Sequence, residues 1–391
     1  MVGTPPAAVS RRGRGVCPRH CGILALMLPT HPPHSSPHEK ASQTLVLGIE
    51  SSCDETAAAV VADDGSVLSN VVASQTAVHA KFGGVVPELA ARAHISQIDG
   101  VVNEAVSQAR LSIHNLGAIA VTTGPGLAGA LLVGVNYAKA LSYGLGIPLI
   151  GVNHLEGHIA SAWLGDPTFP LPCVVLVVSG GHTHLYRKGQ TGECLLLGCT
   201  RDDAAGEAFD KGAQMLGLEF PGGPSIDRLA RQGDPTAIPF PRFHQRKTSL
   251  EFSFSGLKTA LLYTLRKMDE DARAKKLADL AAGYQEAIVQ VLVAKALAAL
   301  AHTGLSALAV VGGVSANSRL RTLLAERVKR EGIRLALPPP VYSTDNAAMI
   351  ALAGRQRLMT NLQADRPIDI QPSLRQGYVR PSVYDKEIAH S

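Results

Sequence analysis

The chain has 391 residues, of which 46% are hydrophobic and 18% are charged. This composition is typical of a folded protein and excludes one that is disordered over most of its length, while the length favours two core-forming lobes over one. The formal net charge is +5, but residues 1–40 hold five basic side chains against one glutamate. The main body is therefore close to neutral, and its charge neither supports nor excludes an RNA substrate.

The cysteines and the hydropathy pattern favour a soluble protein. The six cysteines form no C-x-x-C pair and are too sparse for a disulfide-rich secreted scaffold, which indicates a reducing, cytoplasmic compartment. Cys17, His20 and Cys21 resemble half of a zinc site, but no second half follows at the usual spacing. No uninterrupted apolar run reaches the roughly 20 residues that span a bilayer, so we predict no membrane partner.

Residues 1–43 are predicted to be a disordered leader, because they are rich in Pro, His, Ser and Arg and lack sustained periodicity. Three interpretations compete: a transit or export signal, a functional tail, and a gene start placed too early. Prolines break any long amphipathic helix, and no clear A-x-A cleavage site follows Leu28. We favour the last two interpretations, and organelle targeting stays open.

From Thr44 the pattern changes to buried strands and turns. The stretch TLVLGIE is predicted to be a buried strand, SSCDET a polar turn, and AAAVVAD a second strand that leads to SVLSNVVAS. A helix is predicted from Glu88 to Ala109, and a strand from Ala118 to Val121 leads into the turn GPGLAGALLVG and another helix. These elements form a first lobe, predicted over residues 44–150.

The order of strand, glycine turn and strand recurs in CVVLVVSGGHTHLYRKG. A helix-rich insert (272–302), the strand LAVVGG with its helix (317–331), and a loop and helix in YSTDNAAMIALAGRQRL follow. Two similar α/β lobes with a cleft between them fit this order best. The second lobe is predicted over residues 151–345, and residues 346–391 are predicted to be a C-terminal helix and tail that packs back towards the first lobe.

Two histidines, His154 and His158 in VNHLEGHIASAW, stand four residues apart. On a helix they project from one face and can hold one metal ion, and Asp345 in the polar turn YSTDN is the best candidate for a third ligand. Two histidines and a carboxylate leave positions open for substrate, which suits catalytic zinc or iron. The alternative is that the histidines have packing or surface roles. Glu156 points away from the histidine face, so the pair differs from the H-E-x-x-H pattern of zinc proteases.

Glycine turns follow two of the predicted strands. The turn VVSGGHTHL places Gly180 and Gly181 where the missing Cβ lets a phosphate approach the backbone. The segment VVGGVSANSRLR repeats the arrangement, with Ser315 and Asn317 beside a helix start that can receive the sugar or base of a nucleotide. A simple turn is the alternative for each. The second turn is not a G-x-G-x-x-G motif and no G-x-x-x-x-G-K-[ST] loop occurs, which disfavours Rossmann oxidoreductases and P-loop NTPases.

The hairpin tip in GIESSCDETAAAVV presents Ser51, Ser52, Asp54 and Glu55. Such a tip could bind a phosphate, with the carboxylates orienting a nucleophile, a cation or a water. The alternative is an ordinary solvated turn, because Ser and Asp are common in such turns. Taken by itself, this motif favours the solvated turn over a binding site.

A further carboxylate-rich segment, DDAAGEAFDKGAQMLGLEFPGGPSID, contains Asp210, Gly223 and Asp227. The two aspartates could hydrogen-bond ribose hydroxyls or a substrate amine, and the glycine permits close approach. Helix capping and solvation are the alternative.

Together these motifs resemble the TsaD family of tRNA N6-adenosine threonylcarbamoyltransferases, in its bacterial branch. The resemblance runs from about Thr44 to Tyr378. The motifs occur in the same order as in the family: GIESSCDETAAAVV, GPGLAGALLVG, VNHLEGHIA, VVSGGHTHL, DDAAGEAFDKGA, PGGPSID, FSFSGLKTA, VVGGVSANSRLR and YSTDNAAMIA. The resemblance implies the actin-like ATPase (ASKHA) fold, an α/β architecture of two ribonuclease-H-like lobes around a nucleotide cleft. It also implies transfer of the threonylcarbamoyl group from threonylcarbamoyl-AMP to N6 of the adenosine 3′ of the anticodon, in tRNAs that read codons beginning with A, with release of AMP.

The resemblance assigns roles to residues that match the family motifs. His154, His158 and Asp345 would bind one divalent or trivalent metal per subunit, iron in preference to zinc. ATP or AMP could occupy the adenylate site, which would be formed by Val178, Ser179, Gly180, Gly181, His182, Asp210, Gly223, Asp227 and Asn317. Asp54 and Glu55 are our hypothesis for the groups that steer or deprotonate the attacking amine.

Members of the family are thought to act on tRNA with a paralogous actin-like subunit (TsaB-like) and a small ATPase (TsaE-like), downstream of the synthase that makes threonylcarbamoyl-AMP. The helix from Glu88 to Ala109 is our candidate for docking the paralogue. Other functions stay open: a metal-independent kinase or ATPase of the same fold, a metalloprotease, and a scaffold subunit of a tRNA-modifying complex. A nucleotide-only enzyme would not need two histidine ligands, because Mg²⁺ prefers oxygen.

Overall fold

The first sheet has five strands in the order β3-β2-β1-β4-β5 in the computed structural model, which describes residues 44–241, 249–360 and 368–373. The predicted leader, and residues 361–367 and 374–391 of the predicted tail, lie outside the described residues. The elements of this sheet and its helices are β1 (Val46–Glu50), β2 (Glu55–Val61), β3 (Val67–Ser74), α1 (Thr76–His79), α2 (Pro87–Gln108), β4 (Ala118–Gly124), α3 (Ala128–Leu145) and β5 (Leu149–Asn153).

The second sheet has the order β10-β9-β6-β7-β8. Its elements and the neighbouring helices are α4 (His154–Ala160), α5 (Ala162–Gly165), β6 (Cys173–Val178), β7 (Thr183–Lys188), β8 (Cys194–Cys199), α6 (Ala205–Met215), α7 (Gly222–Ala230), α8 (Ser255–Arg266), α9 (Glu270–Lys275), α10 (Leu277–Thr303), β9 (Ala307–Val311), α11 (Ser318–Glu331) and β10 (Arg334–Ala336). The last helix of the described residues, α12 (Ala347–Met359), packs on the first sheet.

The two sheets repeat one topology. The first strand of each, β1 or β6, pairs antiparallel with the next strand and parallel with the fourth, β4 or β9. Both central strands are buried along their whole length, as the apolar runs VLGIE and CVVLVV predicted. Loops that leave the same ends of these strands therefore meet at the same edge of each sheet.

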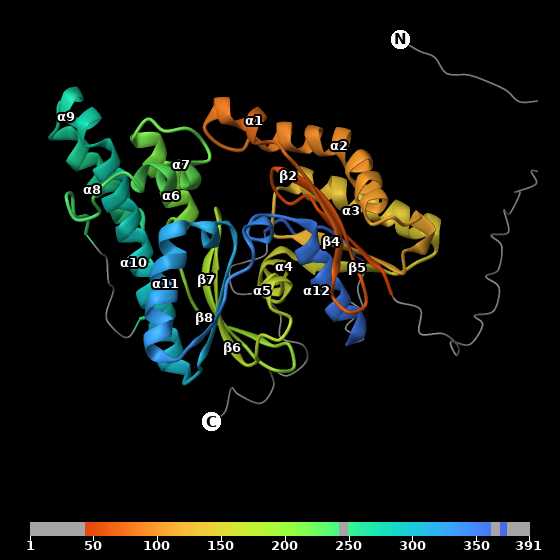
Figure 1. The fold of residues 1–391 in the computed structure, drawn as a ribbon. Coiled ribbons are helices and arrows are strands. Elements are labelled where there is room, and N and C mark those ends of the chain that lie inside the picture. Colours follow the sequence, from red (N-terminus) through yellow and green to blue (C-terminus); the bar gives the residue numbers. More distant parts are fainter. Residues whose placement is uncertain (1–43, 242–248, 361–367, 374–391) are drawn as a thin grey trace, which may run out of the picture. The chain divides into compact units, whose positions relative to one another are not determined.

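Helices cover both faces of each sheet (Figure 1). On β1, Leu47 and Ile49 face α2 and α3, while Val46 faces α12 from the end of the chain. On β6, alternate residues face α6, α7, α8 and α10 on one side and α4 and α5 on the other. This alternation follows from the two-residue period of a strand and gives each lobe a core on either side of its sheet.

Helix α10 is long and apolar enough to cross a membrane when judged by length and composition alone. In the structure, 56% of its most apolar stretch is buried, and its side chains belong to the core cluster that covers β6. Asp279, Glu286 and Lys295 interrupt its apolar sequence. We describe it as a core helix of the second lobe.

Close packing of α12 on β1 depends on Gly48. A Cβ on this residue would lie 2.3 Å from the carbonyl oxygen of Ala347 and 2.6 Å from the backbone nitrogen of Ala351. We expect Gly48→Ala to lower the free energy of unfolding by about 1–3 kcal/mol, because backbone atoms cannot move aside cheaply. The control is Gly100→Ala in α2, where no atom lies within 4 Å of the added Cβ.

Chemical denaturation of both variants checks this expectation. Gly100→Ala should be neutral or stabilising by up to about 1 kcal/mol, because alanine favours helix over glycine. Equal stabilities for the two variants would contradict the packing argument.

Candidate functional site

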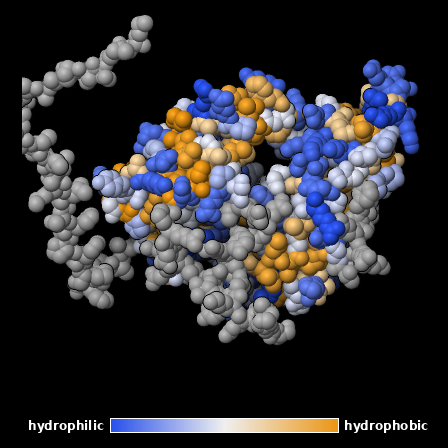
Figure 2. Space-filling model, turned by 180° about the vertical axis from the view of Figure 1, so that it is seen from behind, coloured by the Kyte–Doolittle hydropathy of each residue, from blue (hydrophilic) through white to orange (hydrophobic). Residues whose placement is uncertain are grey.

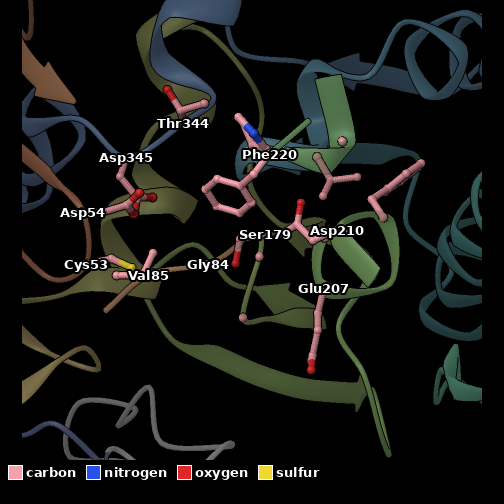
Figure 3. Close-up of a pocket in the computed structure, with 18 of the residues that line it drawn as sticks. Cys53, Asp54, Gly84, Val85, Ser179, Glu207, Asp210, Phe220, Thr344 and Asp345 are labelled. Atoms are coloured by element: carbon pink, nitrogen blue, oxygen red, sulfur yellow. The ribbon is translucent and has the colours of Figure 1, made fainter. Parts of the chain in front are cut away.

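A cavity of about 850 Å³ is lined by the loops that follow β1, β6 and β9, with further residues from α6 and α7. Both lobes contribute to its wall. Figure 3 shows the carboxylates of Asp54 and Asp345 in one part of the cavity and Ser179 and Asp210 in another. The volume falls within the range of sites for nucleotide-sized ligands.

Most site residues predicted from the sequence line this cavity: Asp54, Glu55, His154, Ser179, Gly180, Gly181, His182, Asp210, Gly223, Asp227, Asn317 and Asp345. Val178 and His158 do not line it. Val178 is the last residue of β6 and His158 lies one helical turn after His154, and both are 0% exposed.

The histidine pair lies on α4, as the spacing predicted. Asn153 caps this helix, because its side-chain oxygen accepts hydrogen bonds from the backbone N–H groups of Leu155 and Glu156 at 2.8 and 3.4 Å. The cap starts the helix at His154 and so turns both imidazoles to one side. Glu156 points elsewhere and binds Arg357 of α12.

Asp345 meets both imidazoles, although it lies far along the chain. Its Oδ1 is 3.6 Å from Nε2 of His154 and 3.1 Å from Nε2 of His158. One ligand atom from each of the three residues lies within 4.8 Å of the others. Neither ring nitrogen of His158 has a hydrogen-bond partner with acceptable geometry in the described part of the chain. Buried polar atoms are rarely left unsatisfied, so this cluster is suited to a metal ion.

The charges of the cluster stabilise one another. Burial disfavours a charged His154, but the carboxylates of Asp345 and Glu50 outweigh it and raise the pKa of the imidazole to about 9. Burial likewise opposes ionisation of Asp345, yet the two histidines hold the pKa of its carboxyl well below the usual value. Burial, reinforced by the neighbouring histidines, lowers the pKa of His182 to about 3, so this ring is neutral.

The glycine turn after β6 is held by its own backbone and by α6. The N–H of Ser179 donates to the carbonyl of His182 at 2.8 Å, and the N–H of Gly206 donates to the carbonyl of Ser179 at 3.1 Å. A Cβ at Gly180 or Gly181 would meet no atom within 4 Å, and neither residue has a positive φ. The fold therefore does not require glycine at these two positions, and the missing side chains leave the backbone of the turn open to the cavity.

Three other polar residues of the cavity wall are partly committed to structure. Asp210 Oδ1 accepts from the N–H of Gly222 at 2.7 Å, and Asp227 Oδ1 accepts from the hydroxyl of Ser318 at 2.7 Å. Asn317 caps α11, and its Nδ2 also donates to Gln285 at 2.7 Å. These hydrogen bonds join α6, α7 and α11 into one wall of the cavity. The amide of Asn317 has a second N–H, which can donate to a ligand.

The hairpin tip is not the ordinary solvated turn that its sequence alone favoured. Ser51 and Ser52 are buried, and Asp54 and Glu55 line the cavity. Burial, with the charges of Asp345 and Asp54, raises the pKa of Glu55 to about 9. Glu55 therefore carries its proton at neutral pH when no cation is near.

Comparison with known proteins decides the family. Residues 66–352 match the family model TsaD, tRNA N6-adenosine threonylcarbamoyltransferase. The chain belongs to the TsaD family.

Two similar relatives carry the name tRNA N6-adenosine threonylcarbamoyltransferase. The protein of Geotalea uraniireducens is 52% identical over 328 residues, which cover 84% of this chain and 95% of that one. The protein of Anaeromyxobacter dehalogenans is 53% identical over 333 residues, which cover 85% and 99%.

Among solved structures, HypF of T. kodakarensis aligns with a TM-score of 0.54 and 14% identity, over 82% of this chain and 48% of HypF. At this identity the likeness concerns the fold alone. The repeated sheet topology and the family assignment confirm the predicted actin-like ATPase fold of this TsaD-family chain.

One residue that contacts the cluster in this TsaD-family chain was missed by the sequence analysis. Glu50, the last residue of β1, is 0% exposed and its Oε2 lies 3.0 Å from Nδ1 of His154. The available signal was a charged residue at the end of an otherwise apolar buried strand, since a buried carboxylate needs a partner.

Proposed function

We propose that this TsaD-family chain transfers the threonylcarbamoyl group from threonylcarbamoyl-AMP to N6 of the adenosine 3′ of the anticodon in tRNAs that read ANN codons, and releases AMP. One observation carries the proposal: the two-histidine, one-carboxylate cluster lies at the wall of a nucleotide-sized cavity, which is also lined by a glycine turn that the fold itself does not require. The names of the two relatives support the same reaction.

His154, His158 and Asp345 are proposed to hold one metal ion, with iron favoured over zinc because this donor set leaves several positions open. When bound, the metal supplies Lewis-acid polarisation and an anchor for the oxygens of the threonylcarbamoyl group. His158 fits this role, since its Nε2 faces Asp345 at 3.1 Å and has no hydrogen-bond partner with acceptable geometry among the described residues, so a metal could bind it.

The chain's own residues position the two reactants. In the turn from Val178 to His182, the N–H groups of Ser179 and His182 donate within the turn, so those of Gly180 and Gly181 bind the phosphate of the adenylate. Asp210, Gly223, Asp227 and Asn317 hold its nucleoside. A bond forms between N6 of the tRNA adenosine and the carbamoyl carbon, the bond from that carbon to the phosphate oxygen breaks, and N6 loses a proton.

Asp54 and Glu55 are proposed to steer the attacking amine and accept its proton. Burial is the main cause of the raised pKa of Glu55, and the charge of Asp345 is the next. A cation beside Asp345 would offset this second contribution and so would favour the ionised carboxylate, which can act as a base. Holding the amine and carbamoyl carbon in contact supplies much of the acceleration.

Metal affinity should depend on pH through His154. The raised pKa of about 9 means that metal must displace a proton from this ring at lower pH. We expect the apparent zinc affinity to rise about tenfold per pH unit up to about pH 9. A competition titration with a chromophoric chelator between pH 6 and 9 measures this, and a flat profile would contradict it.

The metal-free protein should show the opposite trend in stability. The pKa of His154 is about 9 in the folded protein and about 6.5 in the unfolded chain, so the protonated ring adds to the free energy of unfolding. This contribution is complete below about pH 6.5 and is lost as the pH rises through about 9. Urea unfolding of the chelated protein at pH 6.5 and 9 checks the sign.

The proposed partners are tRNA, a TsaB-like paralogue, a TsaE-like ATPase and, upstream, the threonylcarbamoyl-AMP synthase, all in the cytoplasm. In Figure 2 hydrophobic side chains gather over part of the surface on the side of the first lobe. Ile95 of α2 is 67% exposed, and Leu132 and Tyr143 of α3 are 44% and 91% exposed. These two neighbouring helices are therefore our candidate surface for the paralogue.

Reconstitution tests the proposed function. The chain is combined with the synthase, the proposed partners, ATP, threonine, bicarbonate and unmodified tRNA, and threonylcarbamoyladenosine is sought by nucleoside mass spectrometry. We expect product that depends on this chain. Absence of product, with adenylate present and tRNA intact, would favour an ATPase of the same fold.

A further inference from the structure

Glu50 is a fully buried carboxylate whose two oxygens are both engaged. The backbone N–H of Ser52 donates to Oε1 at 2.5 Å, and the hydroxyl of Thr122 donates to Oε2 at 2.6 Å. The same Oε2 lies 3.0 Å from Nδ1 of His154. The residue is 0% exposed, so protein groups and not solvent hold it in place.

An ionised carboxylate only accepts hydrogen bonds, so the imidazole must present Nδ1–H to it. The hydroxyl oxygen of Ser52, 3.2 Å from the same nitrogen, can accept a share of this bond. The other nitrogen, Nε2, is the one that faces Oδ1 of Asp345 at 3.6 Å. Glu50 thus sets which nitrogen of His154 turns towards the third ligand.

We propose that Glu50 is the positioning residue of the metal site, which fixes the rotation and tautomer of His154 so that Nε2 ligates the metal. The inference deepens the proposed function and rests on it only in assuming that a metal binds at His154, His158 and Asp345. Groups that orient a metal-bound histidine in this way typically change metal affinity by about 10- to 100-fold when they are replaced.

Glu50→Gln is the sharpest variant because it keeps the shape of the side chain. The N–H of Ser52 requires an acceptor at the Oε1 position, so the amide oxygen should occupy it. The amide NH₂ then faces His154 and donates to Nδ1, which favours the tautomer with the proton on Nε2. With the proton on Nε2, this nitrogen cannot bind the metal. The hydroxyl of Thr122 can rotate to accept a hydrogen bond from the same NH₂, so the replacement leaves that hydroxyl with a partner.

Glu156→Gln is the matched control. Glu156 is a carboxylate on the same helix as His154, but in the described part of the chain it pairs with Arg357 and is not a member of the cluster. Zinc affinity is measured for the isolated proteins by competition with a chromophoric chelator at one pH. We expect Glu50→Gln to bind zinc about 10- to 100-fold more weakly and Glu156→Gln to match the wild type.

A second measurement needs no variant. In zinc-loaded wild-type protein labelled with ¹⁵N-histidine, the spectrum of His154 should show a protonated Nδ1 and a metal-bound Nε2. Coordination through Nδ1 would overturn the proposal even if Glu50→Gln failed to fold.

Two results of the affinity comparison would also overturn it: unchanged zinc affinity of Glu50→Gln, or an equal loss in Glu156→Gln. Failure of the wild type to bind zinc would remove the positioning role as well. The proposed transfer reaction would still be decided separately, by product formation in the reconstituted system.

Discussion

Replacing His158 with glutamine is expected to abolish metal binding and to reduce threonylcarbamoyl transfer at least about 100-fold. His158 is 0% exposed, and its ring nitrogens have no hydrogen-bond partner with acceptable geometry among the described residues. In the metal-free protein the ring contributes the attraction between its Nε2 and Asp345 at 3.1 Å, and the side-chain amide of glutamine can supply an N–H donor to the same carboxylate. The variant should therefore keep its stability in the metal-free state while it loses a ligand.

His184→Gln is the matched control for this result. His184 is equally buried, on β7, and bonds Tyr186 at 3.1 Å outside the cluster. For both variants we measure the metal content by elemental analysis and the rate of threonylcarbamoyl transfer. The stability of each protein is measured by unfolding after a chelator has removed the metal. Transfer at the wild-type rate by His158→Gln, or an equal loss in His184→Gln, would contradict the assignment of the ligand.

Replacing both glycines of the turn after β6, Gly180→Ala with Gly181→Ala, is expected to weaken AMP binding by about 100-fold, or about 2.7 kcal/mol. The added methyl groups meet no atom within 4 Å in the free protein, and neither position has a positive φ. Folding should therefore be unaffected, and the loss should arise only when a phosphate approaches the N–H groups.

Calorimetric titration with AMP measures this effect, and thermal unfolding shows that the fold is intact. Gly144→Ala on α3 is the control, because its Cβ also meets no atom within 4 Å and the residue does not line the cavity. AMP binding that is unchanged by the double replacement would show that the phosphate does not lie against this turn.

Local patterns in the sequence predicted the features that depend on neighbouring residues. Alternation and turn residues predicted the hairpin of β1 and β2, and the spacing of His154 and His158 predicted two imidazoles on one helix face. The glycine turn after β6 was predicted for the same reason, because a strand, two glycines and a second strand form a local pattern.

Features that depend on distant segments were not predictable from pattern alone. Glu50 meets His154 across 104 positions of sequence, and α12 brings its backbone against Gly48. Asn317 is committed to capping α11 and to Gln285, which its motif did not indicate. Each of these contacts depends on how whole helices and strands pack. Packing brings together side chains that are far apart in the sequence, and their spacing along the chain does not indicate that they meet.

The most direct test of the account supplies purified threonylcarbamoyl-AMP, labelled in the threonine, to this chain and unmodified tRNA, with the proposed partners but without the synthase or free threonine. Single-turnover transfer of label to the tRNA is followed in the wild type and in His158→Gln. The account predicts that label reaches the adenosine 3′ of the anticodon with wild-type protein, with stoichiometric AMP, and that His158→Gln fails. Label that reaches tRNA equally with both proteins, or with neither while the adenylate stays intact, would contradict it.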